Sequence, residues 1–443
     1  TDPVTGETRV NHQLRTRSFN NFVYLNGIPV LYWPVLSTDL TKPTFYINNL
    51  QVTNDNVFGT QVQAQLDPYQ LLGISNPPEG TEWSWNASYL SERGFGFGTE
   101  LSYENEDLWG IPGTYRGTLD TWGLNDNGLD NLGADRRAVQ PESDYRGRLS
   151  WQHRQQLPND LQWTAEIGLI SDRNFLEQYF EPQWDQEKDL TTGMELKQTV
   201  ENGSWSLSAD VQLNDFFTQT ETLPRGDHFS LGRSVLFDRA TWYEHTHAGY
   251  FGIKTAALPT NPDQPAQAFL PWETDLTGTE YRERSGLRVA SRQELDLPFQ
   301  WGAVKVVPFL GGEISHWQQD RNGEEVTRLL GQAGVRTSLP IWKANPSIQD
   351  PLFNLQGLIH KVSFDSEFFW ADASEDMSQL PLYDPLDDDS NEMFQRMFLM
   401  DSHAGALPVR FDPRFMALRS GAQRWVTGPT EIADDLFVIQ ANI

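Results

Sequence analysis

Apolar and polar residues alternate along much of the chain, and this period of two predicts β-strands. In residues 204–213 polar and apolar residues alternate without an error. In residues 161–169 the odd positions are apolar and the even positions are polar or glycine. Successive side chains of a strand point to opposite faces, so each of these strands has one dry face and one wet face.

The same pattern recurs, less regularly, over most of the chain. The sequence predicts about sixteen to nineteen strands and almost no helix, with residues 391–400 as the one helical candidate. Asn202-Gly203 and Asn322-Gly323 lie between predicted strands and are typical of tight hairpin turns. The other predicted strands are 44–52, 57–66, 83–90, 95–103, 115–122, 145–151, 191–200, 250–256, 287–297, 303–317, 326–339 and 358–370.

Two kinds of connector separate these strands. Some are short, such as 92–94 and 201–203, whereas others are long and either polar or rich in proline. Short turns at one end of a sheet and long loops at the other are typical of outer-membrane barrels. No run of about 18 apolar residues occurs, but strands of about 9–11 residues also cross a membrane. The long connectors are 124–144, 172–189, 259–278, 343–354 and 371–389.

One stretch departs from the alternation. From Ile28 to Leu36 every residue is apolar or aromatic, which predicts a strand that is covered on both faces. Asn26-Gly27 suits a type I′ turn, so residues 22–25 and 28–31 are expected to form a short hairpin. We interpret this stretch as a junction between two sheets.

The composition narrows the classes of function. The 443 residues carry a formal net charge of −28, which would repel phosphate, so no nucleic acid is expected as a partner. Cysteine is absent, which excludes disulfides and thiolate metal sites. Aromatic residues make up 12 %, too many for a disordered acidic chain. The chain starts at Thr1 without a methionine, and we interpret it as a processed or excised segment.

Tryptophan and tyrosine gather near the ends of the predicted strands. Amphipathic rings are stable at membrane interfaces, so this placement favours an aromatic girdle. The alternative is that these rings form the core of a soluble β-sandwich. The residues concerned are Trp83, Trp85, Tyr103, Trp109, Trp301, Trp317, Trp342 and Trp370.

Few residues indicate a reaction or a metal site. The run from Glu244 to His247 places two imidazoles on one face of a strand, but no third ligand follows at a fixed spacing. The run from Asp387 to Asp389 offers oxygen ligands for Ca²⁺ without the glycine and later glutamate of a dedicated loop. Carboxylate pairs such as Asp172 and Glu177 are expected by chance among 61 acidic residues. We predict no enzyme, no cofactor and no metal centre.

The junction resembles a segment of a known family. Residues 21–36 contain the pattern G-x-P-V-x-Y-x-P. They are similar to the segment that joins the periplasmic β-jellyroll to the barrel in the LptD (OstA) family of outer-membrane lipopolysaccharide-assembly proteins. Weaker similarities to the same family occur at residues 172–180, at His360, and at residues 382–385 leading to Phe394 and Phe398.

This resemblance implies an all-β chain. Residues 1–36 would be the end of a periplasmic β-jellyroll and the junction, and residues 37–443 would be the strands and loops of a transmembrane antiparallel β-barrel. The barrel of the family has more strands than the sixteen to nineteen expected here. The resemblance therefore implies an incomplete barrel, with the chain beginning near the end of the jellyroll and stopping inside the barrel.

The resemblance also implies the last step of lipopolysaccharide export. The barrel would lie in the outer membrane of a Gram-negative cell and insert lipopolysaccharide into the outer leaflet through a lateral seam, without making or breaking a bond. The implied partners are lipopolysaccharide, an LptE-like plug lipoprotein in the lumen, an LptA-like periplasmic bridge protein and the lipids of the outer membrane.

The apolar junction residues would then form a dry path for the acyl chains of the glycolipid. The alternative is that they pack the end of the jellyroll. The residues concerned are Val30, Leu31, Tyr32, Trp33 and Val35.

Three prolines would weaken the lateral seam. Pro29, Pro34 and Pro43 lack the N–H group that donates to a neighbouring strand. A net hydrogen bond contributes about 0.5–1.5 kcal/mol, so the loss of two or three would lower the cost of parting the strands by a few kcal/mol.

Two other functions share part of this pattern. A generic outer-membrane porin or substrate channel has the same strands and girdles but does not need the junction with its flanking prolines. A soluble β-sandwich carbohydrate-binding protein has the same alternation, but its dry faces pack together instead of facing lipid. The direction of the apolar faces therefore separates the sandwich from the two membrane proteins.

Overall fold

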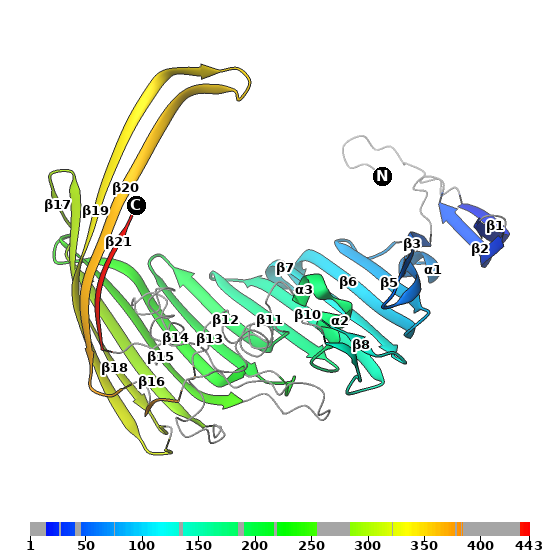
Figure 1. Cartoon of the computed structure of the whole chain (residues 1–443), viewed down its shortest axis with the longest axis horizontal. Helices are drawn as coiled ribbons and strands as arrows, with labels where there is room; N and C mark the ends of the chain where they lie inside the picture. The colour runs from blue at the N-terminus through cyan, green and yellow to red at the C-terminus, as the bar shows by residue number, and fades with distance from the viewer. Residues whose placement is uncertain are drawn as a thin grey trace.

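A computed structural model gives the arrangement of the strands (Figure 1). It describes residues 15–25, 28–39, 46–74, 76–132, 136–184, 190–216, 219–254, 284–320, 322–376, 379–381, 383 and 435–443. Strands dominate these ranges, and the helices in them are short: α1 (Pro68–Leu71), α2 (Phe175–Tyr179) and α3 (Glu181–Trp184). None of these helices is long and apolar enough to cross a membrane.

Most of the strands belong to one antiparallel sheet, the main sheet. It contains seventeen strands of the described residues, a number within the predicted range. The strands are β3 (Ile47–Asp55), β4 (Gly59–Leu66), β5 (Thr81–Leu90), β6 (Gly94–Leu108), β7 (Ile111–Asn125), β10 (Tyr145–Leu157), β11 (Leu161–Ile170), β12 (Thr192–Val200), β13 (Gly203–Val211), β14 (Gln219–Val235), β15 (Ala240–Lys254), β16 (Ser285–Asp296), β17 (Phe299–Trp301), β18 (Val304–Trp317), β19 (Val326–Asp350), β20 (Leu355–Ala373) and β21 (Leu436–Asn442).

The strand order of the main sheet is that of an up-and-down barrel, with neighbours in space that are also neighbours along the chain. The short β17 and the longer β16 both pair with β18. Paired residues join each of these strands to the next, except that β16 pairs directly with β18, and within the described ranges no paired residues join β21 to β3. Figure 1 shows these two strands at opposite ends of a curved sheet.

Short and long connections of the main sheet are only partly separated between its two ends, because the predicted short turn at 92–94, between β5 and β6, lies at the same end as the long loops. The turns β6–β7, β10–β11, β12–β13, β14–β15 and β19–β20 are short and lie at one end, the short-turn end. The connections after β7, β11, β15 and β20 are long and lie at the opposite end, the long-loop end. This asymmetry follows from the antiparallel order, because alternate connections lie at the same end of the sheet.

One predicted connector is wrong. Residues 343–354 are mostly strand, because β19 continues to Asp350 and pairs with β20 almost to its end. The resulting β19–β20 hairpin extends well past the other strands at the short-turn end (Figure 1). Pro340 and Pro346 gave this segment the appearance of a loop, but the long antiparallel partner tolerates them, with a register shift between Asn345 and Gln349.

Three smaller features complete the described structure. β1 (Arg15–Leu25) and β2 (Ile28–Asp39) form a separate two-stranded sheet. β8 (Asp130–Asn131) and β9 (Arg137–Val139) form another, within the connection between β7 and β10. α2 and α3 lie in the connection between β11 and β12. The helical candidate at 391–400 and the acidic run at 387–389 lie outside the described residues.

Candidate functional site

The main sheet buries charged side chains and exposes apolar ones. Along β16, Arg288 and Glu294 are buried, whereas Leu287 and Val289 are exposed. The charged and apolar residues alternate, so they lie on opposite faces of the strand. We call the face with the buried charges the inner face and the face with the apolar residues the outer face.

Neighbouring strands repeat this arrangement. Glu313 in β18, Arg328 in β19 and Glu367 in β20 are buried. On the opposite face Leu310 in β18 is 65 % exposed and Ile439 in β21 is 73 % exposed. A soluble sheet buries its apolar face, because that removes apolar surface from water. The main sheet has the opposite polarity, which is the pattern of a sheet that faces lipid on its outside.

Aromatic rings form a cluster on the outer face toward the short-turn end. The Trp151 indole donates to the Tyr103 hydroxyl at 3.1 Å, and that hydroxyl is 2.9 Å from His153 Nδ1. The Tyr103 ring lies against Gly117, where an added Cβ would come within 2.4 Å of the ring. Trp163 lies beside His153 with 4.9 Å between the ring centroids. The placement agrees with a girdle at this end.

The other aromatic residues predicted for a girdle divide into two groups. Those at the short-turn end include Trp109 in a tight turn and Trp301 in β17, both strongly exposed. Trp370 is half-exposed near the long-loop end of β20. Trp317 contradicts the prediction, because it is fully buried on the inner face, where Leu380 and Tyr383 pack in the same cluster.

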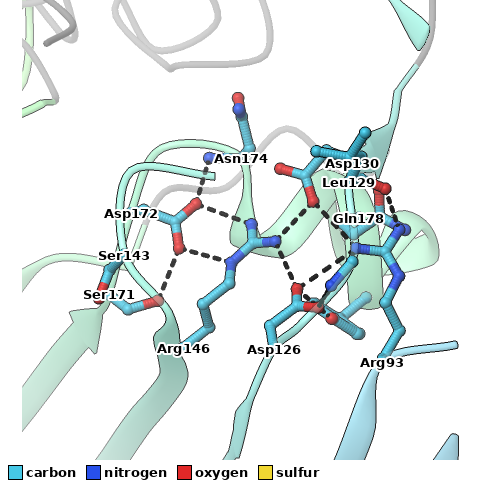
Figure 2. Close-up of polar contacts among 12 residues, drawn as sticks. Arg93, Asp126, Leu129, Asp130, Ser143, Arg146, Ser171, Asp172, Asn174 and Gln178 are labelled. Atoms are coloured by element: carbon cyan, nitrogen blue, oxygen red, sulfur yellow. Dashed lines mark hydrogen bonds and ion pairs between the residues drawn. The ribbon is translucent and has the colours of Figure 1, made fainter. Parts of the chain in front are cut away.

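Arg146, at the start of β10, is the centre of a buried ionic network at the long-loop end. Its Nη1 donates to Asp126 at 3.0 Å and to Asp130 at 2.5 Å. Its Nε and Nη2 donate to the two oxygens of Asp172 at 2.9 and 2.8 Å. Figure 2 shows Arg146 between Asp172 on one side and Asp126 and Asp130 on the other. A second arginine, Arg93, approaches Asp126 at 3.3 Å and Asp130 at 3.6 Å.

The carboxylates of this network lie outside the main-sheet strands and have different pKa shifts. Burial raises the pKa of Asp126, but hydrogen bonds from Tyr179 and the Gly128 amide, with the charges of the two arginines, outweigh it, so the net pKa is lowered. Burial raises the pKa of Asp130, and the charge of Arg146 does not fully offset it. Burial and the bond to Asp126 both raise the pKa of Tyr179. Asp126 is thus the carboxylate whose charge this site stabilises.

The same network holds the loop with α2 and α3 against the strands. The Tyr179 hydroxyl donates to Asp126 at 2.6 Å, and its ring centroid is 5.3 Å from that of Trp122 in β7. Phe175 is fully buried in a cluster with Leu124. The Arg148 guanidinium lies 3.5 Å from the centre of the Phe180 ring. This loop includes residues 172–180, which the sequence singled out by family resemblance.

Another arginine on the inner face, Arg336 in β19, also contacts three carboxylates. Its Nη1 lies 2.8 Å from Glu294 and 3.4 Å from Asp296, and its Nε lies 2.9 Å from Glu367. In contrast to Arg146, its side chain is 27 % exposed. Arg336, Asp296 and Glu367 border a cavity of about 360 Å³. This cluster is therefore within reach of a solute inside the sheet.

The possible reactive residues have structural partners. Asp172 forms an ion pair with Arg146, and Glu177 forms one with Arg136 at 2.7 Å, so both members of this candidate carboxylate pair have a structural partner. His245 and His247 lie on the inner face of β15, as their spacing predicts, next to Asp227 of β14. The described residues thus contain a possible third ligand that the sequence spacing did not reveal.

The junction residues form the predicted hairpin. Leu25 pairs with Ile28 and Tyr24 with Pro29, in the register expected for a two-residue turn, and a register shift follows at Val23, although Asn26 and Gly27 lie outside the described residues. Tyr32 is 51 % exposed and packs on Phe22 with 4.8 Å between ring centroids. The expectation that both faces are covered is therefore wrong at Tyr32, because β2 belongs to a sheet of only two strands.

The remaining junction residues are located only by their backbone. Trp33 pairs with Asn21 and Val35 with Phe19. Pro29 is exposed and lies opposite Tyr24, next to a register shift, which is where a residue without an N–H is tolerated. Pro34 also lies in β2, which pairs with β1 and not with the main sheet. The side chains of Val30, Leu31, Trp33, Pro34 and Val35, and all of Pro43, lie outside the described part of the chain.

Apart from Asp172, sequence reasoning missed the residues of the Arg146 network. They are separated by tens of positions, and nothing local distinguishes Asp126 or Asp130 from other acidic loop residues. The one local signal is Arg146 itself, a charged residue directly after the first residue of a predicted strand. Only the strand order brings the ends of β5, β7, β10 and β11 together.

No known family matches the chain, and no curated protein is similar to it. The function must therefore be argued from the geometry of the described residues and from the junction sequence.

Proposed function

We propose that the chain is part of an outer-membrane translocon that inserts lipopolysaccharide into the outer leaflet. The observation that carries the membrane part of this proposal is the polarity of the main sheet, with buried charges on the inner face and exposed apolar residues on the outer face. The apolar outer face suits lipid, and the charged inner face suits the sugars and phosphates of a polar solute. The resemblance of residues 21–36 to the family junction supports lipopolysaccharide as that solute.

The ends of the main sheet support the orientation of the barrel. In outer-membrane barrels the short turns are periplasmic and the long loops are extracellular. The long loop with α2 and α3 would then lie at the cell surface, and the aromatic cluster around Tyr103 would lie at the periplasmic interface. The proposal requires the edges of β3 and β21 to be paired or covered in the membrane, because an open sheet edge cannot face lipid.

The porin is the second candidate, because its inner face would be charged in the same way. The soluble sandwich is disfavoured by the exposed apolar residues of the outer face. A first experiment compares the gel migration of heated and unheated samples in detergent. A barrel migrates differently before heating, whereas identical migration would contradict a membrane barrel.

Photo-crosslinking separates the translocon from the porin. A photo-reactive residue at Leu31 or Trp33 is expected to capture lipopolysaccharide in cells if the junction forms the acyl path. A matched control carries the same group at Trp109, an exposed residue in the β6–β7 turn. No adduct at Leu31 and Trp33, together with ion conductance of the purified protein in planar bilayers, would favour the porin.

The lateral seam has its own test. Pro34→Ala in β2 and Pro43→Ala shortly before β3 each restore a backbone donor in the segment that leads into the main sheet, so under this proposal the seam is expected to open less easily and lipopolysaccharide to reach the surface more slowly. Pulse-labelling of surface lipopolysaccharide measures that rate. An unchanged rate in both variants would contradict the role of these prolines, while leaving the export function open to the crosslinking test.

A further inference from the structure

Two neighbouring strands place three metal-binding side chains together on the inner face. His245 and His247 alternate along β15 and so share a face. Asp227 of β14 lies directly opposite His247 in the register, and Phe229 lies opposite His245. The sequence supplied only the two histidines. The third side chain comes from the strand pairing.

The geometry of the group is close to that of a metal site. One carboxylate oxygen and one nitrogen from each histidine all lie within 4.8 Å of one another. His245 Nε2 is 2.8 Å from Asp227 Oδ1. The donors of one tetrahedral zinc ion lie about 3.3–3.5 Å apart, since its bonds to N and O are about 2.0–2.2 Å long. The Asp227–His245 pair is closer than this spacing, and the other donor pairs of the group lie within 4.8 Å.

From this juxtaposition we infer that Asp227, His245 and His247 bind a divalent transition-metal ion, with Zn²⁺ as the best fit. Two imidazoles and one carboxylate suit zinc and exclude a preference for Ca²⁺ or Mg²⁺, which take oxygen ligands. Three protein ligands leave a fourth position open. Asp227 borders a cavity of about 530 Å³ on the inner face, so water or an anionic oxygen of a solute can approach the group from the side of Asp227.

Neighbouring side chains hold the members of this group in place. Arg225 donates to both oxygens of Asp227, from Nε to Oδ2 at 2.7 Å and from Nη2 to Oδ1 at 2.8 Å. When Oδ1 binds the metal, the Nε bond to Oδ2 still orients the carboxylate, as hydrogen bonds to metal-binding carboxylates commonly do. The Phe229 ring stacks on His245 with 4.0 Å between centroids and fixes the plane of the imidazole.

The competing explanation is an ion pair without metal. Arg225 and His245 both contact Asp227 in this structure, and such a cluster is stable by itself. The two explanations differ in what happens when a metal ion is offered. The inference does not depend on whether the barrel exports lipopolysaccharide or conducts small solutes.

The test uses the full chain purified in detergent and titrated with Co²⁺, whose absorption spectrum reports nitrogen and oxygen ligands. We expect one Co²⁺ per chain, displaced by Zn²⁺. His245→Ala, His247→Ala and Asp227→Asn should each weaken binding by more than about tenfold, because even hydrogen-bond partners of ligands cause losses of that size. The matched control is His228→Ala, which removes an imidazole on the outer face of β14, bonded to Glu244 at 2.6 Å.

Folding is checked in every variant by gel migration before and after heating. Unchanged migration with lost Co²⁺ binding assigns the loss to the ligand. Absence of Co²⁺ uptake by the unmodified chain would overturn the inference and leave the ion pair. Equal loss in His228→Ala would show that the metal binds surface histidines, which would overturn it as well.

Discussion

Two arginines of this protein each bind three carboxylates, yet their surroundings differ. Arg146, at the long-loop end, contacts Asp126, Asp130 and Asp172, and none of its side chain is exposed. Arg336 contacts Glu294, Asp296 and Glu367, and 27 % of its side chain is exposed. The same set of charges is thus sealed in one place and open to the inside of the sheet in the other.

The loop with α2 and α3 causes the difference. The Tyr179 ring lies over the Arg146 guanidinium and packs on Phe175, whereas Arg336 borders a cavity. Removing one partner of a buried ion pair is strongly destabilising, because the remaining charge then has neither a partner nor water around it. A more exposed one is screened by water and is worth much less. The comparison indicates that Arg146 fastens the loop, while Arg336 remains available to a solute.

The largest expected effect comes from Arg146→Ala. It leaves Asp126, Asp130 and Asp172 buried without their shared cation, so the free energy of unfolding should fall by about 3–5 kcal/mol. Urea unfolding in detergent micelles, followed by tryptophan fluorescence, measures this change. Trp122 and Trp184 lie in or against the loop cluster and report its loss. If Arg146→Ala lowered the free energy of unfolding no more than Arg336→Ala, the proposed difference between the two arginines would be wrong.

The next largest effect concerns Asp126 and Asp130 of the Arg146 network, whose contributions to stability depend on pH in opposite directions. The pKa of Asp126 is lowered on folding, so its stabilisation is present above the unfolded value of about 3.9 and is lost as the pH falls through the lowered folded value. The pKa of Asp130 is raised, so its contribution has the opposite sign and is lost as the pH rises through the folded value.

Asp126→Asn should therefore lower the free energy of unfolding at pH 7 by about 1.5–3 kcal/mol, the value of hydrogen bonds to a charged group. It should also reduce the loss of stability on acidification. Asp130→Asn is the matched control, with a smaller effect at pH 7. Unfolding curves at pH 7 and at about pH 3 give both values. Equal losses at pH 7 would contradict the difference between the two sites.

The features that could be predicted from the sequence are those that depend on residues close together along the chain. Alternation predicted most strands of the main sheet, because a period of two is local. It missed β14 (Gln219–Val235), in which Pro224 and two register shifts interrupt the pattern, and the short β17 and β21. The Asn202-Gly203 turn was confirmed between β12 and β13 for the same local reason.

The functional residues were harder to predict, because they are joined by strand pairing. His245 and His247 were found from their spacing, but Asp227 enters only through the register of β14 with β15. The Arg146 network connects four strand ends, and no spacing along the chain encodes it. The roles of Val30, Leu31, Tyr32, Trp33 and Val35 stay a prediction from family resemblance.

The open cluster should respond more weakly to mutation. Arg336→Ala is expected to lower the free energy of unfolding by only about 1–2 kcal/mol, because the Arg336 side chain is partly exposed and borders a cavity from which water can replace it beside Asp296 and Glu367. Its main effect should be on solutes, since it makes the inner face more negative next to the cavity. Reversal potentials in planar bilayers should shift toward higher cation selectivity. A shift of equal size in Arg146→Ala would show that both arginines face the lumen.

The smallest effect is expected from Tyr179→Phe. It removes the 2.6 Å hydrogen bond to Asp126 but keeps the ring that packs on Trp122 and covers Arg146. Asp126 still accepts from Arg93, Arg146 and the Gly128 amide, so the free energy of unfolding should fall by about 1 kcal/mol. Urea unfolding measures it, with Tyr145→Phe, an exposed tyrosine at the same end, as the control. If Tyr179→Phe cost as much as Arg146→Ala, the hydroxyl rather than the guanidinium would hold the loop.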